Sequence, residues 1–417
     1  MREKKGIWSL GQRIKTVLFY ILLFLFPTQL ALHFWPSFSF VFGIRVDYLS
    51  VAIYLTDILI FLLILVDLPN VVRMVSKKRW LVGLFLVLAA VNIIFSSVPV
   101  LSFVKWIHIS ILFLFAIYIS ANRWRFGEEA IEKVIYFSLV FFSLIGIVQF
   151  FLGHTLGGVF YYLGERCFNI STPGIALFSF FGREILRAYS TFSHPNSFAG
   201  FLGAAGIFLI LSKSFKKLPL RFFGLAIIFF ATLITFSLST FVSLIFVGAL
   251  YLFEKRVKLK EKYYLWFLII LFSVSTVQFF IPAEFITSPT FSWDKVDQRL
   301  ELAYVSGKMV SERFLTGEGL NTFISNLPRF KTPSGYIWFL QPVHNIYLLV
   351  FSEVGVFGLV LFFFFVSKGI LKLFKEGNRQ VLYTLLFILI TGLFDHYWLT
   401  LQQNLVLMFF IFSYFIA

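Results

Sequence analysis

Charged residues are scarce in this chain of 417 amino acids, and their scarcity excludes a water-soluble fold. Only 13% of the residues are charged, against about 25% in a typical soluble domain, while 59% are hydrophobic and 21% aromatic. Cys167 is the single cysteine, so no disulfide can form within the chain. The sequence also lacks a GxxxxGK[ST] loop, an HExxH pair and a cysteine cluster. We therefore expect no P-loop nucleotide site and no metal site.

Long apolar runs predict an all-α, polytopic membrane protein. The runs are close to 20 residues long, which matches a hydrocarbon core of about 30 Å at about 1.5 Å per helical residue. Runs such as Val17–Trp35 and Val134–Leu152 are apolar on all sides, without the alternation of a membrane strand. We predict a single integral membrane domain over residues 1–417, with the first run an uncleaved helix. The twelve predicted spans are 16–35, 46–66, 80–96, 102–121, 134–152, 197–212, 220–236, 238–253, 263–281, 344–366, 380–394 and 399–416.

The distribution of basic residues predicts the orientation in the membrane. The net charge of +16 is compatible with a nucleic-acid partner, but 25 of the 36 lysines and arginines lie in alternate short loops. This asymmetry is typical of cytoplasmic loops. We therefore expect both termini in the cytoplasm and no nucleic-acid partner.

Two of the predicted outer segments are long, 153–196 and 282–343. The second is expected to be a mostly helical loop between the ninth and tenth spans. It contains an amphipathic stretch, 293–314, whose apolar positions recur with a helical period. Asp294 and Asp297 fall in the first turn of that stretch, and two glycines in Thr316–Leu320 (TGEGL) end it. The expected apolar face of this helix comprises Val296, Leu300, Ala303, Val310 and Phe314.

Two groups of polar residues precede predicted spans at the outer face. Arg187 can pair with a phosphate, while His194 and Asn196 stand at the start of the sixth span, where free N–H groups suit an anion. A proline-asparagine turn beside a membrane-surface arginine explains the same pattern. His344 and Asn345 stand at the start of the tenth span, where the helix dipole lowers the pKa of a histidine and leaves it neutral as a general base. An interfacial histidine bonded to backbone is the alternative.

Other polar residues have equally simple structural explanations. Arg299, on the predicted outer helix, is either a ligand-binding group or a solvent-facing residue. Asp395–Trp398 forms the turn between the last two spans, and a polar turn beside aromatic residues explains it. Asp57 and Glu353 are expected at mid-membrane depth, where an acid either serves function or bonds a neighbouring helix. A shared metal ion is one explanation for Asp294 and Asp297, but acids in the first turn of a helix explain the pair better.

The order of these stretches resembles the O-antigen ligase and polymerase superfamily. The resemblance covers roughly residues 180–417. It rests on RAYSTFSHPNSFAGFL from Arg187, the helix with Arg299, LTGEGLNTF from Leu315, HNIYLLVFSEVGVFGLVLF from His344 and GLFDHYWLTLQQNLVLMF from Gly392.

The resemblance implies a GT-C-like fold and a glycosyltransferase of the bacterial inner membrane. Such an enzyme takes a glycan from undecaprenyl diphosphate and passes it to an acceptor hydroxyl at the periplasmic face. The acceptor is lipid A-core for a ligase of lipopolysaccharide biosynthesis, another lipid-linked repeat for a polysaccharide polymerase, and a protein hydroxyl in some relatives. No cofactor, no nucleotide sugar and, for the ligases, no metal is implied.

The resemblance also assigns roles to residues. His344 falls on the histidine taken as general base, Arg299 on the arginine taken to bind the diphosphate, and Arg187 and Asn196 on an R…PN signature. His194, Asn345 and Glu353 are expected to support these groups. One position departs from the family, because Leu238 in Thr235–Thr240 (TFSLST) stands where a second arginine is usual. We expect Arg187 to supply that missing charge.

Two other classes of protein remain open at this point. A transporter or flippase of lipid-linked glycans would carry ion-coupling acids at mid-membrane, broken helices and internal repeats. A scaffold without catalytic activity would tolerate the departure at Leu238. The location of a cavity separates the first from an enzyme, because a transferase needs it at the outer face and a transporter at the midplane.

Overall fold

Helices dominate the structure, a computed structural model that describes residues 10–257, 259–277, 294–332 and 335–416. Among the described residues, four helices are long and apolar enough to cross a membrane, and the bent pair α2 Leu55–Val66 and α3 Leu68–Lys77, which turns by 89°, would make a fifth span. The four long helices are α5 Pro99–Phe126, α6 Glu128–Leu152, α9 Leu238–Arg256 and α14 Ile346–Lys375. The other helices that overlap predicted spans are α1 Leu10–Phe24, α4 Arg79–Ile94, α7 Pro195–Ile210, α8 Arg221–Leu233, α10 Glu261–Val277, α15 Arg379–Thr391 and α17 Gln402–Ile416.

Each predicted span overlaps one of these helices, so the all-helical character of the membrane region agrees with the prediction. The number of crossings stays a prediction. Helices of 12 or 13 residues, such as α2, α8 and α15, rise only about 18–20 Å, which is less than the hydrocarbon thickness. The predicted end of the ninth span, 278–281, and the start of the following loop lie outside the described residues.

The first two spans are shorter than predicted because part of each forms a β-ribbon. Helix α1 ends at Phe24, shortly before Pro27, since a residue before proline is disfavoured in helical conformation. Strand β1 Ala31–Phe34 then pairs antiparallel with β4 Val51–Tyr54. The residues between them form the hairpin of β2 Phe40–Val41 and β3 Ile44–Arg45. Apolar composition alone does not separate such strands from helix.

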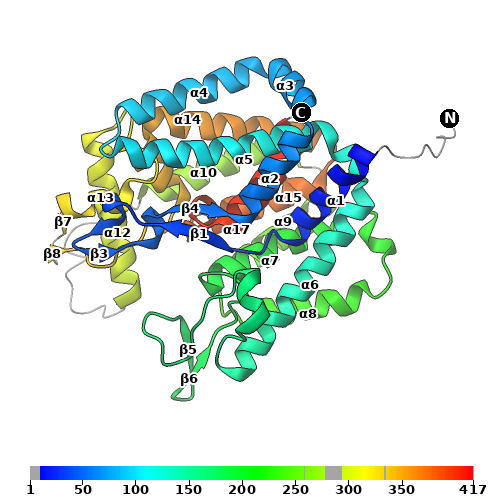
Figure 1. Cartoon of the computed structure of the whole chain (residues 1–417), viewed down its shortest axis with the longest axis horizontal. Helices are drawn as coiled ribbons and strands as arrows, with labels where there is room; N and C mark the ends of the chain where they lie inside the picture. The colour runs from blue at the N-terminus through cyan, green and yellow to red at the C-terminus, as the bar shows by residue number, and fades with distance from the viewer. Residues whose placement is uncertain (1–9, 258, 278–293, 333–334, 417) are drawn as a thin grey trace.

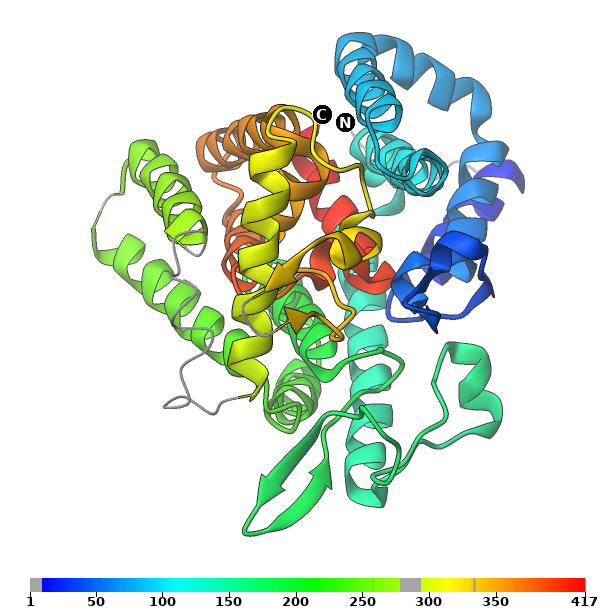
Figure 2. The same cartoon turned by 90° about the vertical axis from the view of Figure 1, so that its left-hand side faces the viewer.

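The helices lie side by side, and the two ends of the bundle differ in character. At one end the last turns of α5 and α17 meet, with the Arg123 guanidinium 4.3 Å from the ring centroid of Tyr414. At the other end lie α12 Asp294–Glu312, α13 Phe323–Asn326, and the pair β7 Lys331–Thr332 and β8 Gly335–Tyr336 (Figure 1). We call this second end the site end. Figure 2 looks onto it and shows α12, in yellow, lying across the helices behind it.

The segment before α7 carries a second β-hairpin. Strands β5 Leu177–Phe180 and β6 Arg183–Leu186 pair antiparallel and project from the bundle (Figure 1). Arg187 directly follows β6, and a connecting segment then leads into α7. The hairpin therefore fixes where the arginine enters the core.

Helix α12 begins and ends close to the predicted positions, but its apolar face is rotated. Ala303 and Val310 are buried as predicted, whereas Phe314 is 52% exposed. The side chains of residues 294–297, including Val296 and the two acids, lie outside the described ones. The most buried residues of this helix are Leu302, Val305, Ser306 and Met309. The helix packs on α14, which determines the buried face.

The longest helix, α14, is broken at Gly355, and the loop after α12 docks into the break. Gly355 has a φ of 71°, and a Cβ added there would lie 2.3 Å from the Leu315 carbonyl oxygen. A Cβ at Gly317 would lie 2.4 Å from the Glu353 carbonyl carbon. Only glycine combines this backbone conformation with such close approach.

Backbone hydrogen bonds join the two pieces across the break. Glu318 N donates to the Ser352 oxygen at 2.8 Å, Gly319 N donates to the Glu353 oxygen at 2.9 Å, and Val356 N donates to the Phe314 oxygen at 2.9 Å. The break exposes helix carbonyls that would otherwise bond within the helix, and the loop satisfies them. We call the loop Thr316–Leu320, the break at Gly355 and the side chain of Asn92 the glycine clamp.

Asn92 completes the glycine clamp from α4. Its Nδ2 donates to the Thr316 oxygen at 3.0 Å and to the Glu353 oxygen at 2.9 Å. Its Oδ1 accepts from Leu320 N at 2.9 Å and from Trp106 Nε1 at 2.8 Å. The clamp thereby ties α4, α5, α12 and α14 together and fixes α12 across the site end.

Candidate functional site

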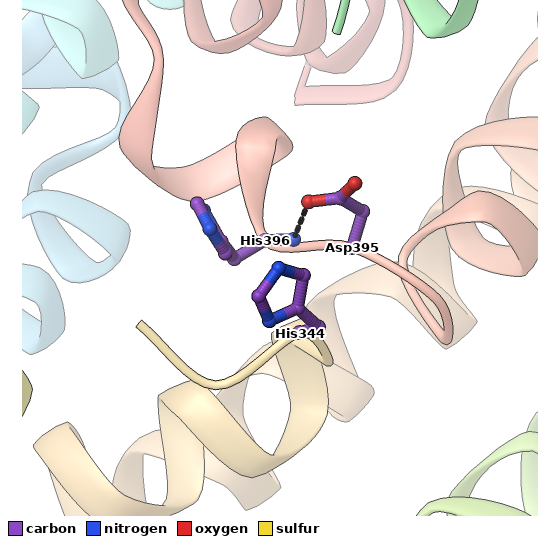
Figure 3. A group of neighbouring side chains, drawn as sticks. All are labelled: His344, Asp395 and His396. Carbon is purple, nitrogen blue, oxygen red and sulfur yellow. Dashed lines mark hydrogen bonds between the residues drawn. The ribbon is translucent and has the colours of Figure 1, made fainter. Parts of the chain in front are cut away.

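Three residues from distant parts of the chain meet at the site end. His344 lies just before α14, while Asp395 and His396 form the turn between α15 and the short helix α16 Tyr397–Thr400. One ligand-type atom from each lies within 4.8 Å of the others. Figure 3 shows the His344 ring pointing toward the turn that carries the other two. With His194, which caps the N-terminus of α7, they make up what we call the histidine cluster.

The rings of His344 and His396 contact each other edge to face. Their centroids are 5.1 Å apart at 67°, and Phe339 stacks on the opposite face of His344 at 6.0 Å. The backbone N–H of His396 donates to Asp395 Oδ1 at 2.9 Å (Figure 3). The His344 Nδ1 atom is buried without a hydrogen-bond partner among the described residues. A buried polar atom of this kind is uncommon and calls for an explanation.

Arg187 and Asn196 connect to the cluster through hydrogen bonds. Arg187 Nη2 donates to Asn196 Oδ1 at 2.7 Å, and Asn196 Nδ2 donates to Asp395 Oδ2 at 3.2 Å. Arg187 Nε donates to the Thr235 carbonyl oxygen at 2.5 Å. The structure therefore brings together the two residues of the predicted R…PN signature and joins them to Asp395. It also places the Arg187 side chain at the turn between α8 and α9.

That turn holds Leu238, where the resemblance leads us to expect an arginine. Leu238 begins α9 and is 75% exposed, so it does not contribute to a buried site. The Arg187 guanidinium bonds to the backbone three residues before it. Burial lowers the pKa of Arg187 to about 10, and the arginine still carries its charge at pH 7. That Arg187 supplies the charge expected at Leu238 stays a prediction.

Arg299 approaches the same cluster from α12. Its side chain is exposed, yet its charge acts on the protonation of His194, His344 and His396, which it disfavours. The field of a charge is strong only at short range in this setting. Arg187, Arg299 and His344, which are far apart in the sequence, thus converge on one end of the bundle.

The imidazoles of the cluster are neutral at physiological pH. Burial lowers the pKa of His344 to about 3, and Asp395 only partly opposes this effect. Burial likewise lowers the pKa values of His194 and His396 to about 4. Asp395 behaves differently. Burial raises its pKa, but His396, His344, His194 and Arg299 lower it by more, so that the pKa is about 2. Since the imidazoles are uncharged at pH 7, the charges of Arg187 and Arg299 favour ionised Asp395 there.

A cavity of about 490 Å³ adjoins the histidine cluster, a volume typical of small-molecule sites. The ribbon β1–β4, the start of α5, the segment 161–174 and the start of α17 contribute to its lining. His194 and Gln341 line it directly. His396 contacts its wall through Thr400 Oγ1, 2.7 Å from His396 Nδ1, and through the Tyr48 ring, 5.5 Å away.

Two predicted supporting residues hold α14 in place. Asn345 caps the helix, its Oδ1 accepting from Tyr347 N at 2.9 Å and Leu348 N at 3.2 Å. This cap sits beside His344 and fixes the direction in which the helix begins. Glu353 lies nine residues after His344, roughly 13 Å along the helix, and accepts from Phe323 N at 3.2 Å. It belongs to the region of the glycine clamp.

Asp57 lies elsewhere than predicted. It is in the first turn of α2, because the helix begins nine residues later than the predicted span. Its Oδ1 accepts from Gln402 Nε2 at 2.7 Å, and its Oδ2 is 3.5 Å from His108 Nε2. The carboxylate thus stands at a helix end beside the cavity and not at the middle of a span.

Sequence reasoning underestimated the turn Asp395–Trp398. A polar turn next to aromatic residues is common, and no local pattern states that Asp395 faces Asn196 or that His396 faces His344. The available signal was its composition, an acid next to a histidine at a predicted outer turn. Lys105 on α5 gave no signal, because a single lysine in an apolar run is usually a membrane-surface residue.

His344, Asp395 and His396 also match the donor set of a transition-metal site. The surroundings do not favour a cation. Asp395 already accepts hydrogen bonds from Asn196 and from the His396 backbone, and the charge of Arg299 acts on all three residues. Two arginines at the cluster suit an anion better.

No family model matches the chain, and no curated protein matches it.

Proposed function

We propose that the chain is a membrane glycosyltransferase that moves a glycan from undecaprenyl diphosphate to an acceptor hydroxyl. The observation that carries the proposal is the convergence of Arg187, Arg299 and His344 on one buried cluster beside a cavity. The resemblance to the O-antigen ligase and polymerase superfamily supplies the substrate class. We further propose that the site end lies on the periplasmic face of the inner membrane, which the distribution of basic residues supports, and that the chain has twelve crossings and the GT-C-like fold that the resemblance implies.

The arginines bind the donor diphosphate in this proposal. Guanidinium groups form paired, charge-assisted hydrogen bonds with phosphate oxygens. Bond breaking between the anomeric carbon and the phosphate oxygen leaves negative charge on undecaprenyl diphosphate, and Arg187 and Arg299 stabilise that charge. Asn196 and Asp395 orient Arg187 through the hydrogen bonds described above.

His344 removes the proton from the acceptor. The acceptor oxygen attacks the anomeric carbon from the face opposite the phosphate, its proton passes to the imidazole, and undecaprenyl diphosphate leaves with the electron pair. The configuration at the anomeric carbon is inverted. General-base assistance of this kind contributes about 10²–10⁴ to the rate.

Donor binding strengthens this base. Burial keeps the pKa of His344 at about 3, which makes the imidazole a weak proton acceptor. A bound diphosphate brings negative charge next to the cluster and offsets the charge of Arg299. Nearby negative charge favours the protonated imidazole, so the pKa of His344 rises toward the working range only when the donor is present.

The location of the polar groups favours an enzyme over a transporter. Transporter sites lie near the bilayer midplane on broken helices. Helix α14 is broken, but the glycine clamp fills the break with protein backbone. The cavity is lined by helix ends, the β-ribbon and connecting segments. A polymerase remains the alternative within the class, and a scaffold without activity is the outcome if no transfer occurs.

Reconstitution tests the proposal. The purified protein in lipid vesicles is supplied with a labelled undecaprenyl-diphosphate glycan and with candidate acceptors, among them lipid A-core and a second copy of the donor. Label on lipid A-core identifies a ligase, and a lengthened donor identifies a polymerase. If the donor is not consumed with any acceptor, while the protein is folded, the proposed activity is wrong.

A further inference from the structure

The cavity beside the histidine cluster contains a lysine with which no carboxylate of the described residues pairs directly. Lys105 lies in the second turn of α5 and lines the cavity. Its side chain is partly buried, and within the described parts of the chain its ammonium group forms neither a hydrogen bond nor an ion pair. Removing an ammonium group from water is costly unless an anion compensates it.

The carboxylates whose charges act on Lys105 already have other partners. Asp57 accepts from Gln402 and faces His108, and Glu353 accepts from Phe323 N. The acids in the cavity lining are engaged as well. Glu165 accepts from Gln149, Leu156 N and Gly157 N, and Asp47 accepts from Trp35 and faces Arg45.

A second cation lies in the same lining. Arg166 is exposed, and its Nη1 donates a long hydrogen bond of 3.4 Å to the Ser193 carbonyl oxygen, so other guanidinium donors face away from the described residues and remain available to a ligand. The lining also includes the Gln341 side chain and Gln402, whose buried Oε1 has no hydrogen-bond partner among the described residues, and these groups suit hydroxyls. The cavity therefore combines an uncompensated cation with hydroxyl-binding groups, which suits a phosphorylated sugar.

This cationic region is separate from the two arginines of the proposed donor site. Neither Arg187 nor Arg299 lines the cavity. Asp395 is bonded toward Arg187 through Asn196, whereas His396 contacts the cavity wall through Thr400. The histidine cluster therefore stands between the two cationic regions.

We propose that the cavity binds the second substrate of the transfer, and that this substrate carries a phosphate group bound by Lys105. The assignment as second substrate rests on the proposed function, while anion binding at Lys105 does not. A reaction between two anionic substrates fits two cationic regions on either side of one general base. The phosphate belongs either to a lipid-linked repeat or to a phosphorylated sugar of the acceptor head.

Titration with inorganic pyrophosphate tests this inference on the full chain in nanodiscs. The wild type is expected to bind at two sites, one weakened by Arg299→Ala and the other weakened roughly tenfold or more by Lys105→Gln. Lys105→Arg keeps the charge and should retain binding. Lys308→Gln, which removes an exposed lysine of α12 outside the cavity lining, serves as the control. Thermal unfolding of each variant verifies its fold.

Competition then identifies the source of the phosphate. Displacement of pyrophosphate from the Lys105-dependent site by undecaprenyl phosphate in the nanodisc indicates a lipid-linked acceptor, and displacement by glucose 6-phosphate indicates a phosphorylated sugar. Pyrophosphate binding that Lys105→Gln leaves unchanged overturns the inference, as does the absence of a second site. If only the Lys105-dependent site is found, the anion-binding cavity stands and the proposed donor site fails.

Discussion

Two buried polar regions lie at the same end of this molecule, and they differ in how their hydrogen bonds are satisfied. In the glycine clamp, Asn92 uses both donors and its acceptor oxygen on four partners, three of them backbone atoms. In the histidine cluster, the Nδ1 atom of His344 is buried with no partner among the described residues. Both regions gather residues from distant parts of the chain, so separation in sequence does not distinguish a structural region from a functional one.

This difference indicates which region stabilises the fold and which region is prepared for a ligand. A fully bonded buried network rigidifies its surroundings, because each group would lose a hydrogen bond on moving. An unpartnered buried group costs free energy in the empty protein. The histidine cluster retains such a group next to a cavity. The glycine clamp also holds a buried atom without a partner among the described residues, Glu318 Oε1, but the other oxygen of that carboxylate accepts from Arg329 Nη1 at 2.9 Å, and the clamp fixes the helix that carries Arg299.

Replacing His344 should give the largest effect. We expect His344→Ala to lower the transfer rate by about 10²–10⁴-fold, because the acceptor hydroxyl loses its proton acceptor. Binding of the lipid donor should be unchanged, since the arginines remain. Single-turnover transfer and donor binding measured on the same preparation separate the two effects. Normal transfer by this variant would show that His344 is not the base.

Replacing Arg187 tests whether the cluster depends on the charge next to Leu238. Arg187→Ala should lower transfer by about 10²–10³-fold, which is typical of losing one group that stabilises transition-state charge. Arg187→Lys should recover only part of the activity, because lysine cannot bond both Thr235 and Asn196 as the guanidinium does. Unchanged thermal unfolding of both variants confirms that the loss is functional. Full activity of Arg187→Ala would contradict the proposed replacement of the family arginine.

The glycine clamp should respond in stability. Gly355→Ala places a Cβ against the Leu315 oxygen at a positive φ, and we expect a loss of at least about 2 kcal/mol in the free energy of unfolding. Gly206→Ala on α7, where a Cβ meets no atom within 4 Å, is the matched control. Thermal or denaturant unfolding in detergent measures both. Equal stability of the two variants would mean that the clamp is not rigid.

Acidification should give the smallest of these effects, a loss of folding stability that arises from the histidine cluster. The pKa values of His194, His344 and His396 are lowered by folding, so the unfolded chain binds protons that the folded chain does not as pH falls below 6.5. Stability is therefore complete above pH 6.5 and decreases below it, by about 1–2 kcal/mol between pH 7 and pH 6. His33, whose pKa burial also lowers, acts in the same direction.

Unfolding curves recorded at several pH values provide the measurement. His396→Gln should reduce the pH dependence, while His154→Gln, which alters an exposed histidine, should not. A stability that stays constant from pH 7 to pH 5 would show that these imidazoles titrate normally.

Local features of the chain were predictable from sequence. The apolar runs identified the helices, and the two glycines of Thr316–Leu320 correctly ended α12. The first two spans were predicted too long, because Ala31–Phe34 and Val51–Tyr54 pair as strands across a distance in sequence. Residue types alone nominated Arg187, Arg299 and His344, but they did not nominate Asp395 and His396 above a polar turn.

The sequence by itself determined that this chain belongs in a membrane, because hydrophobic runs near 20 residues and the need to bond every backbone group leave helices as the solution. It also determined where several helices end, since proline and glycine act on their own neighbours. Only the tertiary structure decided that Arg187 bonds Asn196 beside Asp395, that His344 faces His396, and that Lys105 borders a cavity. These arrangements depend on packing between helices that are distant in the chain. Interactions between neighbouring residues in the sequence do not determine such packing.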